Sequence, residues 1–309
     1  MADTSYIIRN YRPADFDSYI ALALEACKLG TNLVTVTAQT ISEGMSWPGY
    51  SAENDLFVVE YEGRIIGYLN FRAELEIGRV IMDGFIHPEH RRKGLAKELL
   101  SHGMRRAREL SAKVVHVNIL EENKATRTVL TRLGFKYIKR FCELKLDMDN
   151  LDWEDADKNA ADCRCLRPGE EGRLADIQNR SFAEHWGYNP NTLETIAYYT
   201  QQKSFSPENV ILTCEGENVT GYCWVEIFTS GIPDNIREAE IHMIGTHPDH
   251  RGKGMGRKLL LAGLSYLKSK DVRIVRLIVD SENEVARALY NSVGFETHRY
   301  NLWYEKEVN

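Results

Sequence analysis

The chain has 309 residues, enough for two domains of about 150 residues each, and its 43% hydrophobic and 27% charged residues are typical of a soluble globular protein. A formal net charge of −6 argues against a nucleic-acid partner, and no apolar run approaches the length of about 18 residues that would predict a membrane-spanning helix. The six cysteines show neither a CxxC pair nor a zinc-ligand spacing, so we expect reduced thiols in a cytoplasmic protein and no metal site.

In chain order, the first half predicts a mixed α/β domain. A strand and a helix precede LFVVEYEGRIIGYLNFR (56–72), which is typical of two strands around a tight Glu-Gly turn. A third strand leads into the turn and helix of HPEHRRKGLAKELL (87–100), and KVVHVNIL (113–120) is a β-branched run typical of a buried strand. A helix and a last strand follow from residue 127. The hairpins at the start argue against a plain doubly wound sheet.

The second half repeats this order of elements. HPDHRGKGMGRKLL (247–260) is identical to residues 87–100 at eight of fourteen positions, and each predicted strand and helix of the first half has a counterpart about 154 to 160 residues later. Self-similarity over this length predicts two copies of one domain.

An acidic segment separates the two copies. DMDNLDWEDADKNAAD (147–162) holds seven acidic residues and one lysine, so it repels itself and is expected to be an extended linker. We therefore predict domains at 1–146 and 163–309. The distance in sequence between matching segments of the two halves increases from about 154 to 160 residues. This increase predicts an inserted loop in the second half, at FTSGIPDNIREAE (228–240).

The turn at 251–256 has the properties of a phosphate-binding site. Its glycines let the backbone turn tightly and approach a ligand closely. The N–H groups that open the following helix lack intrahelical partners and lie at the positive end of the helix dipole, while Arg251 and Lys253 add charge. A glycine turn without a ligand is the alternative, since the spacing matches neither GxGxxG nor GxxxxGK[ST].

The pattern Arg-Gly-x-Gly-x-Gly at 251–256, followed by N-x-x-A-x-x-L-Y-x-x-x-G-F at 283–295, resembles the GNAT superfamily of acyl-CoA-dependent N-acyltransferases. The resemblance covers both halves, and the tandem layout is similar to that of the mycothiol synthases, acetyltransferases built from two such domains. It implies an α/β fold with two tandem GNAT domains, each a mixed, centrally splayed β-sheet flanked by helices, and acetyl-CoA as the cofactor in the splay.

The resemblance also implies roles for residues of the second half. The acceptor amine would attack the thioester directly, and because a free amine is mostly protonated at pH 7, a general base is needed. Glu240 occupies the family's usual place for that base, and Tyr290 would give a proton to the leaving thiolate. A backbone N–H of the splayed strand would stabilise the oxyanion. The implied cofactor contacts are Ile244, Gly245, Thr246, Arg251, Gly252, Lys253, Gly254, Met255, Gly256 and Asn283.

These roles have structural alternatives. Tyr290 is also explained as a packed helix residue, Glu240 as an exposed strand residue and Asn283 as a helix cap. His185 and Trp186 are candidates for binding the acceptor, and their structural alternative is packing. His242 is a further candidate for the acceptor pocket and a rival base, because it points to the same side of the strand as Glu240.

The first half keeps the turn but lacks both proton-transfer groups. Val80 stands at the position of Glu240, and Leu130 stands at the position of Tyr290. We therefore predict that the first domain binds CoA or is structural, without catalysing, although Asp83 is a displaced candidate base. The CoA contacts expected there are Ile86, Arg91, Arg92, Lys93, Gly94, Leu95, Ala96 and Asn123.

The sequence thus predicts an N-acetyltransferase that moves the acetyl group of acetyl-CoA to a primary amine of a small or peptide-like acceptor, with the chemistry in the second domain. One alternative is acetylation of a cysteinyl amine, as in the mycothiol synthases. Another is a non-catalytic acyl-CoA sensor, which Glu240 and Tyr290 argue against because a sensor needs neither group.

Overall fold

The chain forms two compact units in a computed structural model. Unit 1 comprises Met1–Arg140 and Tyr300–Asn309, and unit 2 comprises Phe141–Arg299. Most of the acidic linker, and the part of the inserted loop that holds Gly231 and Pro233, lie outside the described residues. The structure describes residues 5–29, 37–151, 158, 162–229 and 237–309.

Unit 1 has the element order that the repeat predicts, with two additional short helices before the first hairpin. Its hairpin turns at Glu62 and Gly63, which both have positive φ angles of 50° and 75°. The elements are β1 (Ile7–Asn10), α1 (Phe16–Lys28), α2 (Ala38–Gly44), α3 (Ala52–Asp55), β2 (Leu56–Tyr61), β3 (Arg64–Glu74), β4 (Arg79–Ile86), α4 (Leu95–Glu109), β5 (Val114–Leu120), α5 (Lys124–Arg132) and β12 (Glu296–Glu307), of which unit 1 holds the end.

Unit 2 repeats the same plan. A second helix again precedes the hairpin, and Gly216 has a φ of +59° in the hairpin turn. The elements are β7 (Arg164–Cys165), α7 (Glu171–Phe182), α8 (Leu193–Thr200), β8 (Val210–Glu215), β9 (Asn218–Thr229), β10 (Arg237–Thr246), α9 (Met255–Ser269), β11 (Ile274–Asp280), α10 (Glu284–Val293) and β6 (Lys136–Asp147), of which unit 2 holds the end.

Both units contain a mixed sheet, which confirms the predicted fold class. The strand order in unit 1 is β1-β2-β3-β4-β5-β12, and in unit 2 it is β7-β8-β9-β10-β11-β6. In each unit the strands pair antiparallel except for one central parallel pair, β4 with β5 and β10 with β11. In each unit, the predicted phosphate turn and the helix that follows it connect the two strands of this parallel pair.

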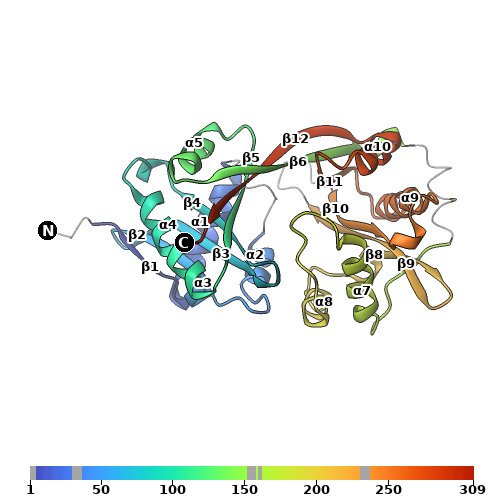
Figure 1. Cartoon of the computed structure of the whole chain (residues 1–309), viewed down its shortest axis with the longest axis horizontal. Coiled ribbons are helices and arrows are strands. Elements are labelled where there is room, and N and C mark those ends of the chain that lie inside the picture. Colours follow the sequence, from blue (N-terminus) through green and yellow to red (C-terminus); the bar gives the residue numbers. More distant parts are fainter. Residues whose placement is uncertain (1–4, 30–36, 152–157, 159–161, 230–236) are drawn as a thin grey trace. The chain divides into compact units, whose positions relative to one another are not determined.

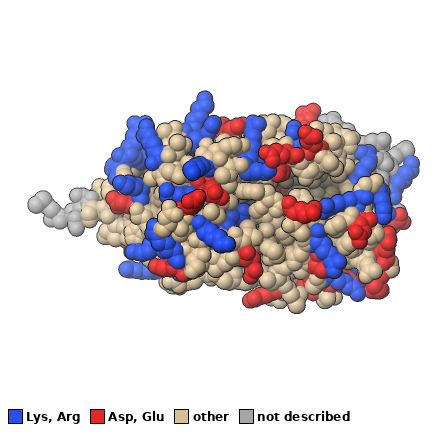
Figure 2. Space-filling view, in the orientation of Figure 1, with Lys and Arg blue, Asp and Glu red and all other residues tan. Residues whose placement is uncertain are grey.

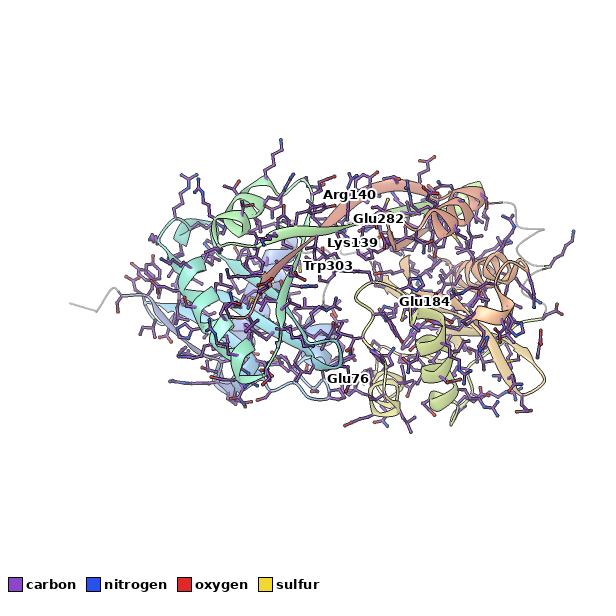
Figure 3. All side chains as sticks on the ribbon, in the orientation of Figure 1. Glu76, Lys139, Arg140, Glu184, Glu282 and Trp303 are labelled. Carbon is purple, nitrogen blue, oxygen red and sulfur yellow. The ribbon has the colours of Figure 1, made fainter. Side chains whose placement is uncertain are left out.

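The two halves of the chain exchange their last strands. β6, from the first half, pairs antiparallel with β11 over residues 141–147, whereas β12, from the second half, pairs antiparallel with β5 over residues 301–307. Figure 1 shows β6 in green beside β11 and β12 in red beside β5, and Figure 3 labels Trp303 on β12. Each half of the chain therefore completes the sheet of the other unit. The predicted boundaries after residues 146 and 162 follow the chain and stay a prediction.

Helices cover both faces of the unit 2 sheet. Gly263 of α9 packs on Cys223, so this helix covers the sheet face to which odd-numbered β9 residues point. Residues of α7 and α8, including Leu174 and Ile196, pack with Tyr222 and Trp224 on the opposite face. The catalytic candidates on β10 are thus placed by a sheet that is packed on both sides.

Within the described part of the chain, no helix is long and apolar enough to cross a membrane. On the face shown in Figure 2, lysine and arginine are interspersed with aspartate and glutamate.

Candidate active site

The central strands of unit 2 separate to form a wedge. β10 pairs with β11 only over Glu238–Glu240 with Ile274–Arg276, and both strands then continue without pairing each other. The edge of β10 that faces β11 therefore has unpaired backbone groups beyond Glu240, and such groups need a partner. The predicted pantetheine contacts, Ile244, Gly245 and Thr246, lie on this open part of β10.

The predicted pyrophosphate turn has the backbone geometry that only glycine adopts easily. Gly252 and Gly254 have φ angles of +74° and +78°, and a Cβ atom at either position would meet nothing within 4 Å. Their requirement for glycine therefore comes from the backbone conformation and not from crowding. Gly254 is the N-cap of α9 and supplies no side-chain cap, so the N–H groups of Met255 and Gly256 in the first turn are available to an anion.

The two cations of this turn are held by main-chain carbonyls. Arg251 donates to the carbonyl of Ser181 at 2.9 Å, and Lys253 donates to the carbonyl of Asp249 at 2.9 Å. Both side chains are exposed beside the turn. They bring positive charge to the glycine segment, as binding a pyrophosphate requires.

Glu240 lies at the closed end of the wedge, where β10 and β11 begin to separate. It is half-buried on the last residue of β10 that pairs with β11. Burial raises the pKa of Glu240 above its ordinary value, His242 and Arg276 oppose that rise, and the carboxylates of Glu226 and Glu143 add to it. A carboxylate with a raised pKa is a better match for taking a proton from an amine near neutral pH.

A β-bulge interrupts β10 directly after this residue. The register with β9 passes from Ile241 opposite Val225 to Met243 opposite Trp224, so His242 is an extra residue without a cross-strand partner. A bulge disrupts the local hydrogen-bond ladder, so the N–H group of His242 is our candidate donor to an oxyanion.

The imidazole of His242 lies on the same side of the sheet as the carboxylates. Its Nδ1 atom is 3.8 Å from a carboxylate oxygen of Glu226, and its ring lies 5.3 Å from Trp224 and 6.3 Å from Tyr199, measured between ring centroids. His242 is therefore part of the pocket around Glu240, and it stays a rival candidate for the base.

Tyr290 and Asn283 come from α10 and the turn before it. Tyr290 is buried with its ring 5.9 Å from that of Phe295, and burial raises the pKa of its phenol, so the hydroxyl carries its proton throughout the neutral range. Asn283 caps α10, since its Oδ1 accepts from the N–H of Ala286 at 3.0 Å. The capping bond leaves the amide nitrogen of Asn283 available to a cofactor.

The predicted acceptor residues His185 and Trp186 lie in the segment after α7 and are exposed. Partial desolvation and the nearby positive charge of Arg251 lower the pKa of His185. Arg251 also pairs with Glu184, labelled in Figure 3, at 3.8 Å. The structure therefore groups His185 with the phosphate turn, whereas Trp186 lies 6.0 Å from the ring of Phe141.

Unit 1 keeps the cofactor geometry. β4 pairs with β5 only over Arg79–Met82 with Val114–Val117 and the strands then separate, as in unit 2. Arg92 and Gly94 have φ angles of +63° and +85°, so the turn has the backbone conformation of its counterpart. The other predicted contacts are Ile86, which accepts from Arg91 at 2.9 Å, Lys93, which donates to Tyr6 at 2.5 Å, the buried Leu95, the half-buried Ala96, and Asn123, which caps α5.

The proton-transfer groups of unit 2 have apolar counterparts in unit 1. Leu130, at the position of Tyr290, is buried with an exposure of 7%. The prediction that Val80 stands at the position of Glu240 is wrong by one residue, because the bulge at His242 adds a residue to β10: Ile81 pairs with His116 of β5 as Glu240 pairs with Arg276 of β11, and Val80 matches the buried Ala239. β4 pairs with β3 in an unbroken register, so the strand has no bulge. Asp83 is the only carboxylate among the described residues of β4, and desolvation raises its pKa to about 6, so it stays a candidate base.

One group in unit 1 bears on the expected absence of metal. His87, Glu89 and His90 place three potential ligand atoms within 4.8 Å of one another. Both imidazoles already have partners: Nε2 of His87 lies 3.2 Å from a carboxylate oxygen of Glu25, and Nδ1 of His90 lies 3.1 Å from the hydroxyl of Tyr6. The absence of a metal stays a prediction.

The left-handed conformation of Arg92 predicts a difference in stability. An L-residue at this φ destabilises the folded state by about 1–2 kcal/mol. Glycine removes this strain, but it also increases the entropy of the unfolded chain, which offsets about 0.4–1 kcal/mol of the gain. We expect Arg92→Gly to stabilise unit 1 by up to about 1 kcal/mol and Gly252→Ala to destabilise unit 2 by a similar amount. Thermal unfolding midpoints of the two variants check this, and a lower midpoint for Arg92→Gly would contradict it.

Two residues of the site were not predicted from the sequence, Glu226 and Glu143. Glu226 lies opposite Glu240 on β9, and counting along the predicted hairpin partner could have found it. Glu143 reaches unit 2 on the exchanged strand β6, for which the sequence has no signal.

Comparison with known proteins identifies the family. The family model of the acetyltransferase (GNAT) family matches residues 35–135 and again 173–295. The chain belongs to the GNAT acetyltransferase family. It is an acyl-CoA-dependent N-acyltransferase that uses acetyl-CoA, as the sequence predicted, and the tandem arrangement is confirmed.

Similar proteins share the tandem layout. The mycothiol acetyltransferase of Amycolatopsis mediterranei (strain U-32) is 28% identical over 262 residues, covering 83% of this chain and 86% of the relative. That of Streptomyces coelicolor is 23% identical over 299 residues, covering 96% and 93%.

Solved structures share the fold of the GNAT protein. A GCN5-related N-acetyltransferase from Sphaerobacter thermophilus has a TM-score of 0.73 at 20% identity, covering 100% of this chain and 97% of that chain. A tandem GNAT protein from the clavulanic acid biosynthesis pathway has a TM-score of 0.73 at 17% identity, covering 99% of both.

Proposed function

We propose that unit 2 of this GNAT protein transfers the acetyl group of acetyl-CoA to a primary amine, with Glu240 as the general base. The observation that carries the proposal is the place of Glu240, a half-buried carboxylate with a raised pKa where the wedge opens. By strand pairing its counterpart in unit 1 is Ile81, an apolar residue. The wedge and turn are thus common to both units, whereas the groups that move protons belong to unit 2.

The residues of unit 2 divide the chemistry among them. Bound acetyl-CoA supplies a thioester, whose carbonyl carbon the amine attacks and whose sulfur leaves. An amine is mostly protonated near pH 7 and must lose two protons to become an amide. The first passes to solvent through Glu240 and gives the neutral amine, and Glu240 takes the second after the attack. The N–H at the His242 bulge donates to the carbonyl oxygen as negative charge develops there. Tyr290 gives its hydroxyl proton to the leaving sulfur, which balances the proton that Glu240 takes.

Replacing Tyr290 with phenylalanine is expected to lower kcat about 10- to 100-fold. A general acid is worth about 10²–10⁴-fold, and the loss is smaller here because a thiolate leaves without full protonation. Phenylalanine keeps the ring that packs against Phe295, so the unfolding midpoint should change little. Initial rates at saturating substrates test this, and an unchanged kcat would remove Tyr290 from the mechanism.

The acceptor we propose is a small or peptide-like primary amine, and a cysteinyl amine is the second candidate because the mycothiol acetyltransferases match this chain over most of their length. Wild-type protein would be incubated with acetyl-CoA and S-methyl-L-cysteine methyl ester, glucosamine or a dipeptide amide. Mass spectrometry would detect the N-acetyl product, and the S-methyl group prevents acetylation of sulfur. Formation of no product above an enzyme-free control would refute the proposal and favour the acyl-CoA sensor.

We propose that unit 1 is a second, non-catalytic CoA site. The proposal is supported by its separating strands and by the left-handed Arg92 and Gly94. Isothermal titration of the whole protein with acetyl-CoA is expected to give about two sites per chain. A stoichiometry of one would mean that the turn in unit 1 has kept its shape without its ligand.

A cytoplasmic location is also part of the proposal. All six cysteines lie among the described residues and none forms a disulfide, as is expected for a protein kept in a reducing compartment.

A further inference from the structure

Helix α7 ends directly against the open part of β10 in unit 2. A Cβ atom on Gly245 would lie 2.7 Å from Cβ of Ser181 and 2.8 Å from Cε1 of Tyr222, so a larger residue here would push the helix away. Arg251, in the phosphate turn, donates to the carbonyl of Ser181 at 2.9 Å. The end of α7 is therefore held by the same turn that is expected to bind the pyrophosphate.

The corresponding residues of unit 1 are arranged differently. By strand pairing, Phe85 stands where unit 2 has Gly245. Arg91 stands where unit 2 has Arg251, and its Nε donates to the carbonyl of Ile86, in the strand before its own turn. The bond between the turn and α7 thus belongs to the unit to which we assign the chemistry, and it is not a general requirement of the fold.

Segment 183–191, which follows α7, reaches both sides of the open end of the wedge. On the β10 side, Glu184 lies 3.8 Å from Nη1 of Arg251, and Figure 3 labels Glu184. On the β11 side, the ring of Trp186 lies 6.0 Å from that of Phe141, which pairs with the last residue of β11. Because β10 and β11 do not pair with each other at these ends, the segment lies across their separation.

The far end of the segment is tied back to α7 by one asparagine. Oδ1 of Asn179 accepts from the hydroxyl of Tyr188 and from the N–H of Asn191, both at 2.8 Å, and Nδ2 of Asn179 donates to the carbonyl of Asn191 at 2.9 Å. Asn191 donates in turn to Oε1 of the buried Gln178 at 2.8 Å. Counting from the Arg-Pro pair that both halves share, unit 1 has Leu24 at this position, whose side chain can make none of these bonds.

The segment connects two helices that cover the sheet face of the candidate base. Glu240 lies on the face that α7 and α8 cover, because its cross-strand partner Glu226 is two residues from Trp224 and points to the same side. Tyr199 of α8 lies 6.3 Å from His242 on this face, measured between ring centroids. The segment between the two helices thus borders the space in which the acceptor amine meets the base.

We propose that Asn179 and Arg251 are positioning residues that hold segment 183–191 as one wall of the acceptor site in unit 2. Arg251 fixes the start of the segment beside the phosphate turn, and Asn179 fixes its far end. Neither side chain exchanges a proton with the substrates, since both act through the segment that they hold. This inference rests on the proposed acetyltransferase function of unit 2.

Asn179→Leu, which introduces the residue of unit 1, is expected to raise the KM for the amine about tenfold, because it removes three hydrogen bonds that hold the segment. The kcat and the KM for acetyl-CoA should change less than about threefold, since Asn179 contacts neither the turn nor the base. Initial rates would be measured with S-methyl-L-cysteine methyl ester, glucosamine and the dipeptide amide, each substrate being varied while the other is saturating.

Arg251→Lys separates the holding role from the charge. Lysine keeps a positive charge for the pyrophosphate but lacks the planar fork that reaches Ser181 and Glu184 together. The KM for the amine should rise about fivefold, while the KM for acetyl-CoA stays within about threefold of the wild type. A change in the KM for acetyl-CoA alone would mean that Arg251 serves the cofactor and does not hold the segment.

Two matched controls lie on the same helix. The carboxylate in Asn179→Asp still accepts from Tyr188 and from the N–H of Asn191, so the KM for the amine should stay within about threefold of the wild type. Asp176 pairs with Arg180 at 2.9 Å, and both side chains are exposed. Asp176→Ala should therefore leave the KM for the amine unchanged. If Asn179→Leu fails to fold, Tyr188→Phe decides, because it removes one of the three bonds and should raise that KM about threefold.

Amide hydrogen exchange gives a readout that does not depend on turnover. Residues 183–191 should exchange faster in Asn179→Leu and in Arg251→Lys than in the wild type. Unchanged exchange, or faster exchange with an unchanged KM for the amine, would overturn the inference while the acetyltransferase function stands. Turnover of no primary amine by the wild type would overturn the proposed function and this inference with it.

Discussion

Glu240→Gln is expected to lower kcat by about 10²- to 10⁴-fold, the usual contribution of a general base, while the Kd for acetyl-CoA stays near that of the wild type. Glutamine keeps the shape of the side chain but cannot take a proton from the acceptor. The cofactor would contact the wedge edge and the turn, and neither includes this carboxylate. Steady-state rates and a calorimetric titration of the same preparation measure the two quantities.

Asp83→Asn is the matched control for this change. Asp83 is the carboxylate candidate on the corresponding strand of unit 1, and its pKa is raised to about 6. Turnover of Asp83→Asn should equal that of the wild type. A loss as large as that of Glu240→Gln would place the chemistry in unit 1, and full activity of Glu240→Gln would leave His242 as the base to test next.

The pH profile gives the same prediction a second form. The base must be ionised to work, so kcat/KM falls as pH drops through the pKa of Glu240. Burial and the carboxylates of Glu226 and Glu143 raise that pKa above its ordinary value of about 4.5, although His242 and Arg276 oppose the rise. The acid limb is therefore expected above pH 4.5, and it should be absent from the residual activity of Glu240→Gln.

Much of the fold was predictable because the sequence repeats its local signals. The strand periodicity, the Glu-Gly hairpin turn and the glycine-containing turn before a helix each occur once in both halves. The structure forms the corresponding hairpins and helices. The loss of proton-transfer groups from unit 1 was also visible in the sequence. Leu130 is the buried counterpart of Tyr290. Counting back from the His-Pro pair gave Val80 for Glu240, one residue away from the true counterpart Ile81, because the bulge adds a residue to β10; both are apolar, so the loss of the base was predicted although its position was not.

The exchange of the last strands could not be predicted from the sequence. β6 and β12 end equivalent copies of one domain and carry similar alternations, so local pattern does not say which sheet each joins. The apolar side chains of β6 fit unit 2, where Cys142, Leu144 and Leu146 are buried opposite residues of β11. Because pairing between strands depends on tertiary contacts, the approach of Glu143 to Glu240 became visible only in the structure.

The bulge at His242 was missed for a similar reason. A bulge is one extra residue in a strand, so it changes the alternation of polar and apolar residues at a single position. EIHMIGT reads equally well as a regular strand. The difference between β10 and the regular β4 therefore required the register with the neighbouring strand.

The most direct test of where the chemistry occurs is a matched pair of glutamate substitutions in the two glycine turns. Gly254 and Gly94 have φ angles of +78° and +85°, and both have open space where a Cβ would lie, so the two changes are alike in strain. A carboxylate at either position repels a pyrophosphate at the helix N-terminus.

Turnover of the pair would be measured at saturating amine. We expect Gly254→Glu to lower turnover at least about 100-fold, equivalent to about 2.7 kcal/mol, and to keep one acetyl-CoA site in unit 1. Gly94→Glu should lose that other site and retain most of the turnover. Loss of turnover in Gly94→Glu with activity kept in Gly254→Glu would contradict the assignment of catalysis to unit 2.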